Sequence, residues 1–201
     1  MNIMELDASH KGRRIVVRYK TAFYYKALSL CGDDLFGAVF LLVPFPVAQE
    51  KQYDFTLLDG SRERSRLFGV ANETGEWIGY LETSHEWNDR FRIVNLWVDE
   101  SYRRSGLGGK LMHKALDCAY EGGVRVMVLE TETCNYPAIQ FYRKFGFVFN
   151  GCDLTGHMSD DDIGCEVPLE MRLPLNQPSS EPNDERCLRS PHPQNSTQTR
   201  P

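Results

Sequence analysis

Runs of apolar residues predict three consecutive strands in the middle of the chain. Residues 67–71 and 77–82 have the composition of strands, and the turn-forming residues 72–75 between them predict a hairpin. Residues 91–98 are apolar on both faces, which is typical of a strand at the centre of a sheet. The pattern therefore predicts a meander.

A helical pattern follows the third strand. Its apolar positions recur at intervals of four, at Leu107, Leu111, Ala115 and Ala119. Polar residues occupy the other face, so an amphipathic helix is predicted over residues 108–120, ending at Gly122 and Gly123.

The rest of the predicted core alternates strands and one more helix. Residues 124–130 form a near-continuous apolar run typical of a buried strand, and Pro137 is well placed to begin a helix that stops at Gly146. Residues 147–149 and 167–173 predict the last two strands. We therefore predict an α/β fold with a mixed sheet and helices on it.

Residues 1–65 are harder to interpret. Only residues 15–19 and 40–43 have the pattern of strands, so we assign this part to the N-terminal portion of the same domain. Residues 66–175 make up the predicted core. Residues 176–201 are rich in Pro, Ser, Asn, Gln and Thr and cannot bury much apolar surface, which predicts a disordered tail.

Composition narrows the class of protein. A chain of 201 residues, 41% hydrophobic, suits one globular domain, and its net charge of −5 argues against general nucleic-acid binding. The longest apolar run, residues 35–43, is too short to span a bilayer, and no secretory signal is evident. Six cysteines without compact spacing predict neither a disulfide framework nor a metal site. We expect a soluble cytoplasmic protein.

The turn between the third strand and the first helix carries the clearest chemistry. Its glycines allow close approach to a ligand, and the first amides of the helix are free to bind an anion. A P-loop would need glycine at position 104 and Ser or Thr at position 111, but the chain has Arg104 and Leu111 there. A dinucleotide-binding fingerprint would need glycine at position 111, so neither nucleotide motif fits. The predicted anion site consists of Arg103, Arg104, Ser105, Gly106, Leu107, Gly108 and Gly109.

The spacing Arg-x-x-Gly-x-Gly resembles the pyrophosphate-binding signature of the GNAT superfamily of N-acetyltransferases. Residues 135–147 resemble a second segment of that superfamily, Asn-x-x-Ala-x-x-Phe-Tyr-x-x-x-Gly-Phe. Residues 79–82, 87–89 and 129–131 are similar to the streptothricin acetyltransferases in particular. The resemblance covers about residues 65–173 and is weak before them.

This resemblance implies a GNAT-type, mostly antiparallel sheet that splits between its fourth and fifth strands and has flanking helices. It implies acetyl-CoA as co-substrate and no metal. The pantetheine arm would lie in the split against the backbone of Leu96, Trp97 and Val98. Further cofactor contacts would come from Asn135, Ala138 and Tyr142, although Asn135 also fits a helix N-cap before Pro137.

The reaction needs a base to neutralise the amine and an acid for the leaving thiolate. Tyr142 stands at the superfamily's general-acid position. Many members carry a glutamate on the strand that corresponds to residues 91–98, but this chain has Val94 and Asn95 there. Glu82 is the first candidate for the base. Glu130 and Glu132 are second.

The acceptor is less well defined. The resemblance implies a primary amine of a small cationic molecule, such as a streptothricin-like antibiotic, with a polyamine or protein amine as alternatives. An acidic run, Asp160 to Asp162, would attract a polycation or simply be a solvated loop, and Trp87 and Asn88 would line the acceptor site or form a tight turn. A catalytically silent acyl-CoA-binding module also stays open, as does a homodimer.

Overall fold

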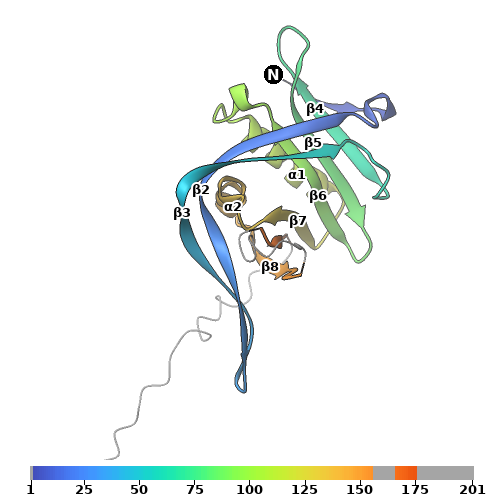
Figure 1. The fold of residues 1–201 in the computed structure, drawn as a ribbon. Helices are drawn as coiled ribbons and strands as arrows, with labels where there is room; N and C mark the ends of the chain where they lie inside the picture. The colour runs from blue at the N-terminus through green and yellow to red at the C-terminus, as the bar shows by residue number, and fades with distance from the viewer. Residues whose placement is uncertain (1, 156–165, 176–201) are drawn as a thin grey trace, which may run out of the picture.

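The computed structural model describes residues 2–155 and 166–175 (Figure 1). The predicted tail at 176–201 and the acidic run at 160–162 lie outside them. Seven strands form one sheet in the order β1-β4-β5-β6-β7-β9-β8. Their bounds are β1 Ile3–Leu6, β4 Ser65–Ala71, β5 Trp77–Glu86, β6 Arg90–Val98, β7 Val126–Glu132, β8 Val148–Cys152 and β9 Pro168–Pro174.

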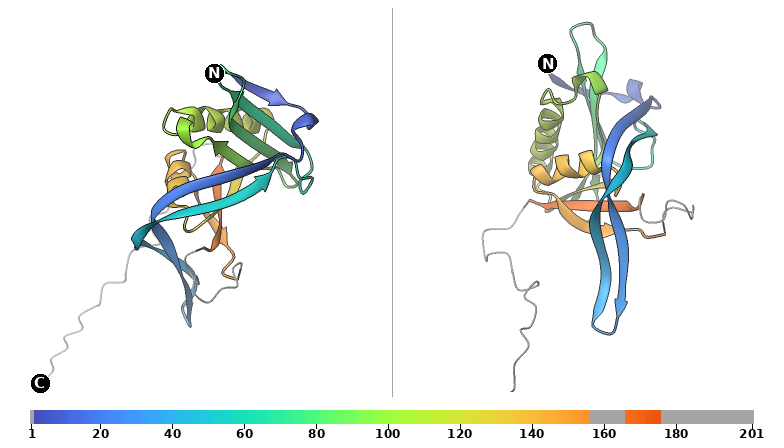
Figure 2. Two further views of the ribbon diagram at one scale, coloured as in Figure 1. Left: turned by 45° about the horizontal axis from the view of Figure 1, so that its top comes forward. Right: turned by 60° about the vertical axis from the view of Figure 1, so that its left-hand side comes forward.

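Two α-helices pack on one face of this sheet, α1 (Leu107–Glu121) and α2 (Tyr136–Lys144) (Figure 2). Their buried apolar residues share a single core with the facing residues of β4 to β7 and β9. The chain also contains two short 3-10 helices, η1 (Ala8–His10) and η2 (Glu100–Tyr102). The predicted hairpin, central strand and both helices are confirmed, with element ends shifted by a few residues.

The sheet splits between its fourth strand, β6, and its fifth, β7, as the resemblance implied. The two strands pair in parallel only as far as Ile93 and Leu129. At that point β6 carries an extra residue against β5, because Glu82 pairs with Asn95 while Thr83 pairs with Ile93, so Val94 is bulged. A bulge bends its strand and increases the local twist, and β6 therefore turns away from β7.

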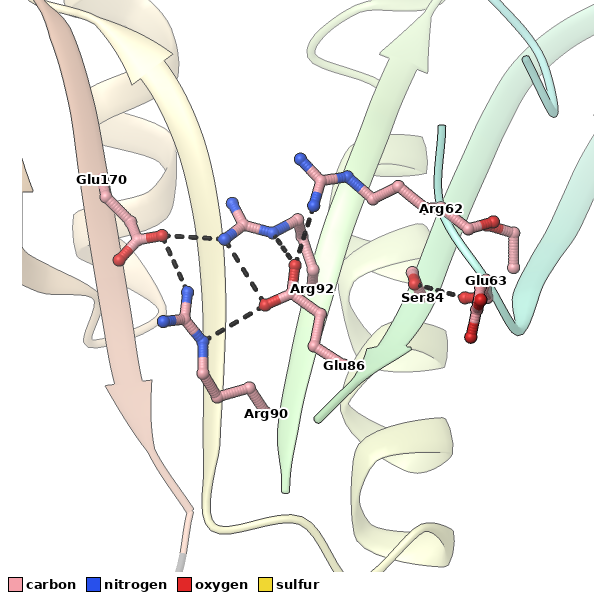
Figure 3. Close-up of polar contacts among 8 residues, drawn as sticks. Arg62, Glu63, Ser84, Glu86, Arg90, Arg92 and Glu170 are labelled. Carbon is pink, nitrogen blue, oxygen red and sulfur yellow. Dashed lines mark hydrogen bonds and ion pairs between the residues drawn. The ribbon is translucent and has the colours of Figure 1, made fainter. Parts of the chain in front are cut away.

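An ion network holds the closed end of the split together (Figure 3). Arg92 on β6 is buried and bonds to Glu86 at the end of β5 and to Glu170 on β9, the latter at 2.8 Å. Arg90 pairs with the same two carboxylates at 3.2 and 2.8 Å, and Arg62 adds a bond to Glu86. Because Glu170 lies beyond β7, this network connects the two halves of the sheet.

The strands predicted at residues 15–19 and 40–43 are confirmed, but each is part of a much longer strand that the sequence did not predict. Strands β2 (Arg14–Gly32) and β3 (Leu35–Thr56) form a long antiparallel two-stranded ribbon, which we call the N-terminal ribbon. Its base packs on the face of the sheet opposite the helices, where Ile15 meets Leu57, Leu67 and Tyr80. It then crosses beside α2, and its far end projects from the molecule (Figures 1 and 2).

Candidate acetyl-CoA site

A pocket of about 1240 Å³ lies at the open end of the split. Strands β6 and β7, the turn after η2 and helix α2 supply most of its lining, and the N-terminal ribbon adds a further wall. Of the residues predicted to bind cofactor, the pocket is lined by Leu96, Trp97, Val98, Arg103, Arg104, Gly106, Gly108, Gly109, Asn135, Ala138 and Tyr142.

The turn after η2 has the backbone of an anion site. Arg104 and Gly106 both have a left-handed conformation, with φ of 62° and 86°, so the chain doubles back before α1 begins at Leu107. No described side chain caps this helix, and its first amides are therefore available to a ligand. Arg103 is fixed by a 3.2 Å bond from its Nε to the carbonyl of Val98.

Two residues of the predicted anion site do not line the pocket. The Leu107 side chain is buried in the main core. The Ser105 hydroxyl donates a 2.6 Å hydrogen bond to the Tyr102 carbonyl, which stabilises the turn. At these positions the side chains serve the fold, and only the backbone amides are left for a ligand.

Beyond the bulge, β6 offers unpaired backbone to the pocket. Asp99 N–H bonds to the Ile78 carbonyl at 2.9 Å, so the backbone of Asp99 faces β5. The backbone groups of successive residues in a strand point to opposite sides, so Asp99 and Trp97 face β5 while Val98 and Leu96 face the split. The side chain of Trp97 lies on the face of the sheet opposite the helices, where its ring stacks on Tyr80.

Helix α2 forms the second side of the pocket. Asn135 caps it by accepting a 3.3 Å hydrogen bond from the Ala138 amide, and it also lines the pocket. Tyr142 lies one helical turn after Ala138 and packs against Phe141 and Phe147. Burial raises the pKa of Tyr142, and the nearby Tyr53 adds to the effect, so its hydroxyl stays protonated.

Glu82 lies beside this pocket but is not part of its lining. Its carboxylate is buried and accepts hydrogen bonds from the Leu58 amide at 3.2 Å and the Asn95 side chain at 3.0 Å. Burial raises the pKa of Glu82, and the bonds from Asn95 and Leu58 only partly oppose the shift. Asn95 does line the pocket, so Glu82 is separated from it by one side chain.

The other two candidate bases, Glu130 and Glu132, line the pocket directly. Both are on β7, two positions apart, and so lie on the same face of the sheet. Opposite them are residues of the N-terminal ribbon that the sequence analysis did not single out, including Tyr19 and Tyr53. No local motif marks these tyrosines, because only the fold of the ribbon brings them to the pocket.

The turn between β5 and β6 is a tight turn, with left-handed backbone at Asn88 and Asp89. Trp87 is 86% exposed, and neither it nor Asn88 lines the pocket. Within residues 2–155 and 166–175, no helix is long and apolar enough to cross a membrane. The same residues contain no group of three or more His, Cys, Asp or Glu side chains placed to hold a metal ion.

A split α/β sheet with an uncapped helix N-terminus at the mouth of the split defines a site suited to an anionic ligand. Residues 37–147 match the family model described as Acetyltransferase (GNAT) family. The match covers more than half of the 201 residues. The chain therefore belongs to the acetyltransferase (GNAT) family.

Individual relatives agree with this assignment. The streptothricin acetyltransferase of Streptomyces lavendulae is 36% identical over 117 residues, which cover 58% of this chain and 61% of that protein. The chain thus aligns with less than two thirds of this relative's length. The crystal structure of nourseothricin acetyltransferase superposes with a TM-score of 0.68 at 27% identity, covering 86% of this chain and 97% of that one.

A Bacillus anthracis protein solved in complex with acetyl coenzyme A superposes with a TM-score of 0.60 over 87% of this chain and 99% of its own. Its identity to this chain is 21%, so the likeness shows the shared fold.

Proposed function

We propose that this protein transfers the acetyl group of acetyl-CoA to a primary amine of a small cationic acceptor. The observation that carries the proposal is the pocket in the split sheet, which joins the uncapped N-terminus of α1 to the buried Tyr142. The helix N-terminus would bind the pyrophosphate of an acyl-CoA, and the thioester at the end of its pantetheine arm would then lie near Tyr142.

The donor would be held by the parts of the site already described. Backbone amides of Gly108 and Gly109, with the positive end of the α1 dipole, would bind the pyrophosphate. Arg103 and Arg104 would add charge-assisted bonds. The backbone of Leu96 and the amide of Val98 would pair with the pantetheine amides, because β6 has no partner on its β7 side there. The Val98 carbonyl already accepts the bond from Arg103.

In the reaction the amine nitrogen attacks the thioester carbonyl, a C–N bond forms and the C–S bond breaks. Tyr142 would donate its proton to the departing CoA thiolate. A buried tyrosine with a raised pKa keeps this proton until a strong base forms beside it.

The amine must first lose a proton. An amine with a pKa of about 10.4 is about 0.04% neutral at pH 7, which costs about 4–5 kcal/mol. Glu82 is the base we propose first, taking the proton from the amine through a water beside Asn95, because its raised pKa makes it a stronger base than an exposed glutamate. Glu132, which lines the pocket, is the second candidate.

The acceptor is proposed from the relatives and from the pocket together. Similarity to streptothricin and nourseothricin acetyltransferases favours an antibiotic amine, and hence a role in antibiotic resistance in the cytoplasm, where acetyl-CoA is available. Arg103 and Arg104 in the same lining would be taken by the anionic donor, and the two carboxylates of β7 then favour a cationic acceptor over an anionic one.

The test combines calorimetry with acetyl-CoA and a free-thiol assay over a panel of amines that includes streptothricin, lysine and a polyamine. We expect acetyl-CoA to bind and thiol to be released with at least one cationic amine. Acetyl-CoA binding without thiol release for any amine would favour a silent acyl-CoA-binding module, which the absence of a carboxylate at Val94 and Asn95 of β6 keeps as the second candidate. Absence of binding would exclude both.

A further inference from the structure

The wall of the pocket opposite β7 comes from the N-terminal ribbon. Tyr19 on β2 and Tyr53 on β3 line it, and their rings meet edge to face with centroids 6.3 Å apart. Their neighbours Val17 and Phe55 continue the wall. Across the pocket are Glu130 and Glu132, so an aromatic surface faces two carboxylates.

Tyr53 occupies a central position on this wall. Tyr53 is 44% exposed, and partial desolvation is the main reason that its pKa is raised. The charge of Glu132 adds to the rise, while that of Arg103 opposes it. Tyr53 is also close enough to Tyr142 to raise the pKa of that group. Tyr53 therefore lies within electrostatic range of the proposed pyrophosphate turn, of Glu132 and of the proposed acid.

Glu132 is fixed in place by a chain of side chains. The Cys134 thiol donates a 3.4 Å hydrogen bond to Glu132 Oε2, and Tyr19 Oη lies 3.3 Å from the Cys134 Sγ. Tyr19 and Cys134 are both buried. The ribbon thus orients a carboxylate of the main sheet.

Charge balance distinguishes the carboxylates of β7 from two other acids near the ribbon, Glu50 and Glu166. Glu50 pairs with Lys20 at 2.8 Å, and Glu166 pairs with Lys51. Among the described residues, neither Glu130 nor Glu132 has an ion-pair partner. The pocket therefore has negative charge available on the wall that faces the two tyrosines.

We infer that Tyr19, Tyr53 and Glu132 form the acceptor-binding site and select amines that carry a second positive charge. The second cation lies between the face of Tyr53 and the carboxylate of Glu132, while the reacting amine points toward Tyr142. This inference rests on the proposed function, because it assigns the acceptor of the same pocket.

The test compares cadaverine, which has two ammonium groups, with pentylamine, which has one. Binding of each is measured by calorimetry on protein saturated with CoA, so that no transfer occurs. We expect cadaverine to bind more tightly and Glu132→Gln to weaken it at least about tenfold, while pentylamine changes little. Tyr53→Ala should weaken cadaverine binding about fivefold. Tyr53→Phe should keep most of the cadaverine affinity, because the ring is kept.

Matched controls are Glu73→Gln in the β4–β5 turn and Tyr120→Ala on the exposed side of α1, both outside the pocket lining. CoA should still bind to every variant, which shows that each is folded. Equal loss of cadaverine and pentylamine, or no loss in Glu132→Gln and Tyr53→Ala, would overturn the inference. Failure of the proposed function is a separate result, because it appears as no thiol release with any amine in the unaltered protein.

Discussion

Tyr142 and Glu82 are both buried, and burial raises the pKa of each. For Tyr142 this favours the neutral phenol that an acid needs. For Glu82 it favours a more basic carboxylate than an exposed glutamate. In the proposed mechanism, the same physical cause would prepare one group to donate a proton and the other to accept one.

Replacing Tyr142 by Phe removes only the hydroxyl and keeps the ring contacts with Phe141 and Phe147. We expect kcat to fall by about 10²–10⁴-fold, because thiolate departure loses its proton donor. Acetyl-CoA affinity, measured by calorimetry, should be nearly intact. An unchanged kcat would remove Tyr142 from the mechanism.

Replacing Glu82 by Gln tests the base through the pH profile. A base must be ionised, so the rate should fall as pH drops through the pKa of Glu82, which lies above its ordinary value of 4.5. In Glu82→Gln we expect this acid limb to disappear from kcat/KM and the plateau to fall about 10²–10⁴-fold. If the acid limb of kcat/KM persists in Glu82→Gln but is lost in Glu132→Gln, the base is Glu132.

At the level of secondary structure, β6 performs two different tasks on either side of the bulge at Val94. Before the bulge it pairs with β7 and carries Arg90 and Arg92, which close the sheet. After the bulge it separates from β7 and directs backbone groups into the pocket. One extra residue in a strand therefore creates both the closed and the open end of the split.

Arg92→Met tests whether the ion network holds the closed end. Removing this guanidinium leaves Glu86 and Glu170, whose side chains are 16% and 24% exposed, with fewer cations. We expect the free energy of unfolding to fall by about 3 kcal/mol, measured by urea denaturation. The control, Arg14→Met, breaks the solvent-exposed pair with Asp54 and should have little effect. Equal effects of the two variants would argue against the network's role.

At the scale of the whole molecule, the pocket is assembled from elements that are distant in the sequence. The ribbon, the split sheet and α2 each contribute one wall. The base of the ribbon is fixed by the Ile15 cluster, and its middle is fixed to α2 by bonds from Gln140 and Arg143 to the Tyr25 hydroxyl at 3.1 and 3.2 Å. A ligand in the pocket therefore contacts all three parts at once.

Acetyl-CoA should accordingly stabilise the entire fold. At about 100 times its Kd it should add about 2.7 kcal/mol to the free energy of unfolding and raise Tm by several degrees. Acetyl-pantetheine at the same concentration lacks the pyrophosphate and should raise Tm less. Equal shifts from both ligands would contradict the assignment of the turn after η2 as the anion site.

The sequence by itself determined the elements from residue 67 onward, the turn at 103–109 and the N-cap at Asn135. These features depend on hydrophobic periodicity, on glycines such as Gly106 and on side chains a few residues away, which are local properties of the chain. The resemblance of two motifs to one superfamily added the split sheet and the donor.

Only the tertiary structure decided the course of the N-terminal ribbon, the burial of Glu82 beneath Asn95 and the meeting of Tyr19 and Tyr53 with Glu132. Each depends on contacts between strands far apart in the chain, and no local pattern encodes which strands will meet. Most of the residues proposed to bind the donor could therefore be named from the sequence, and the structure brings them together in one pocket. The wall proposed to bind the acceptor exists only once the ribbon has folded across the sheet.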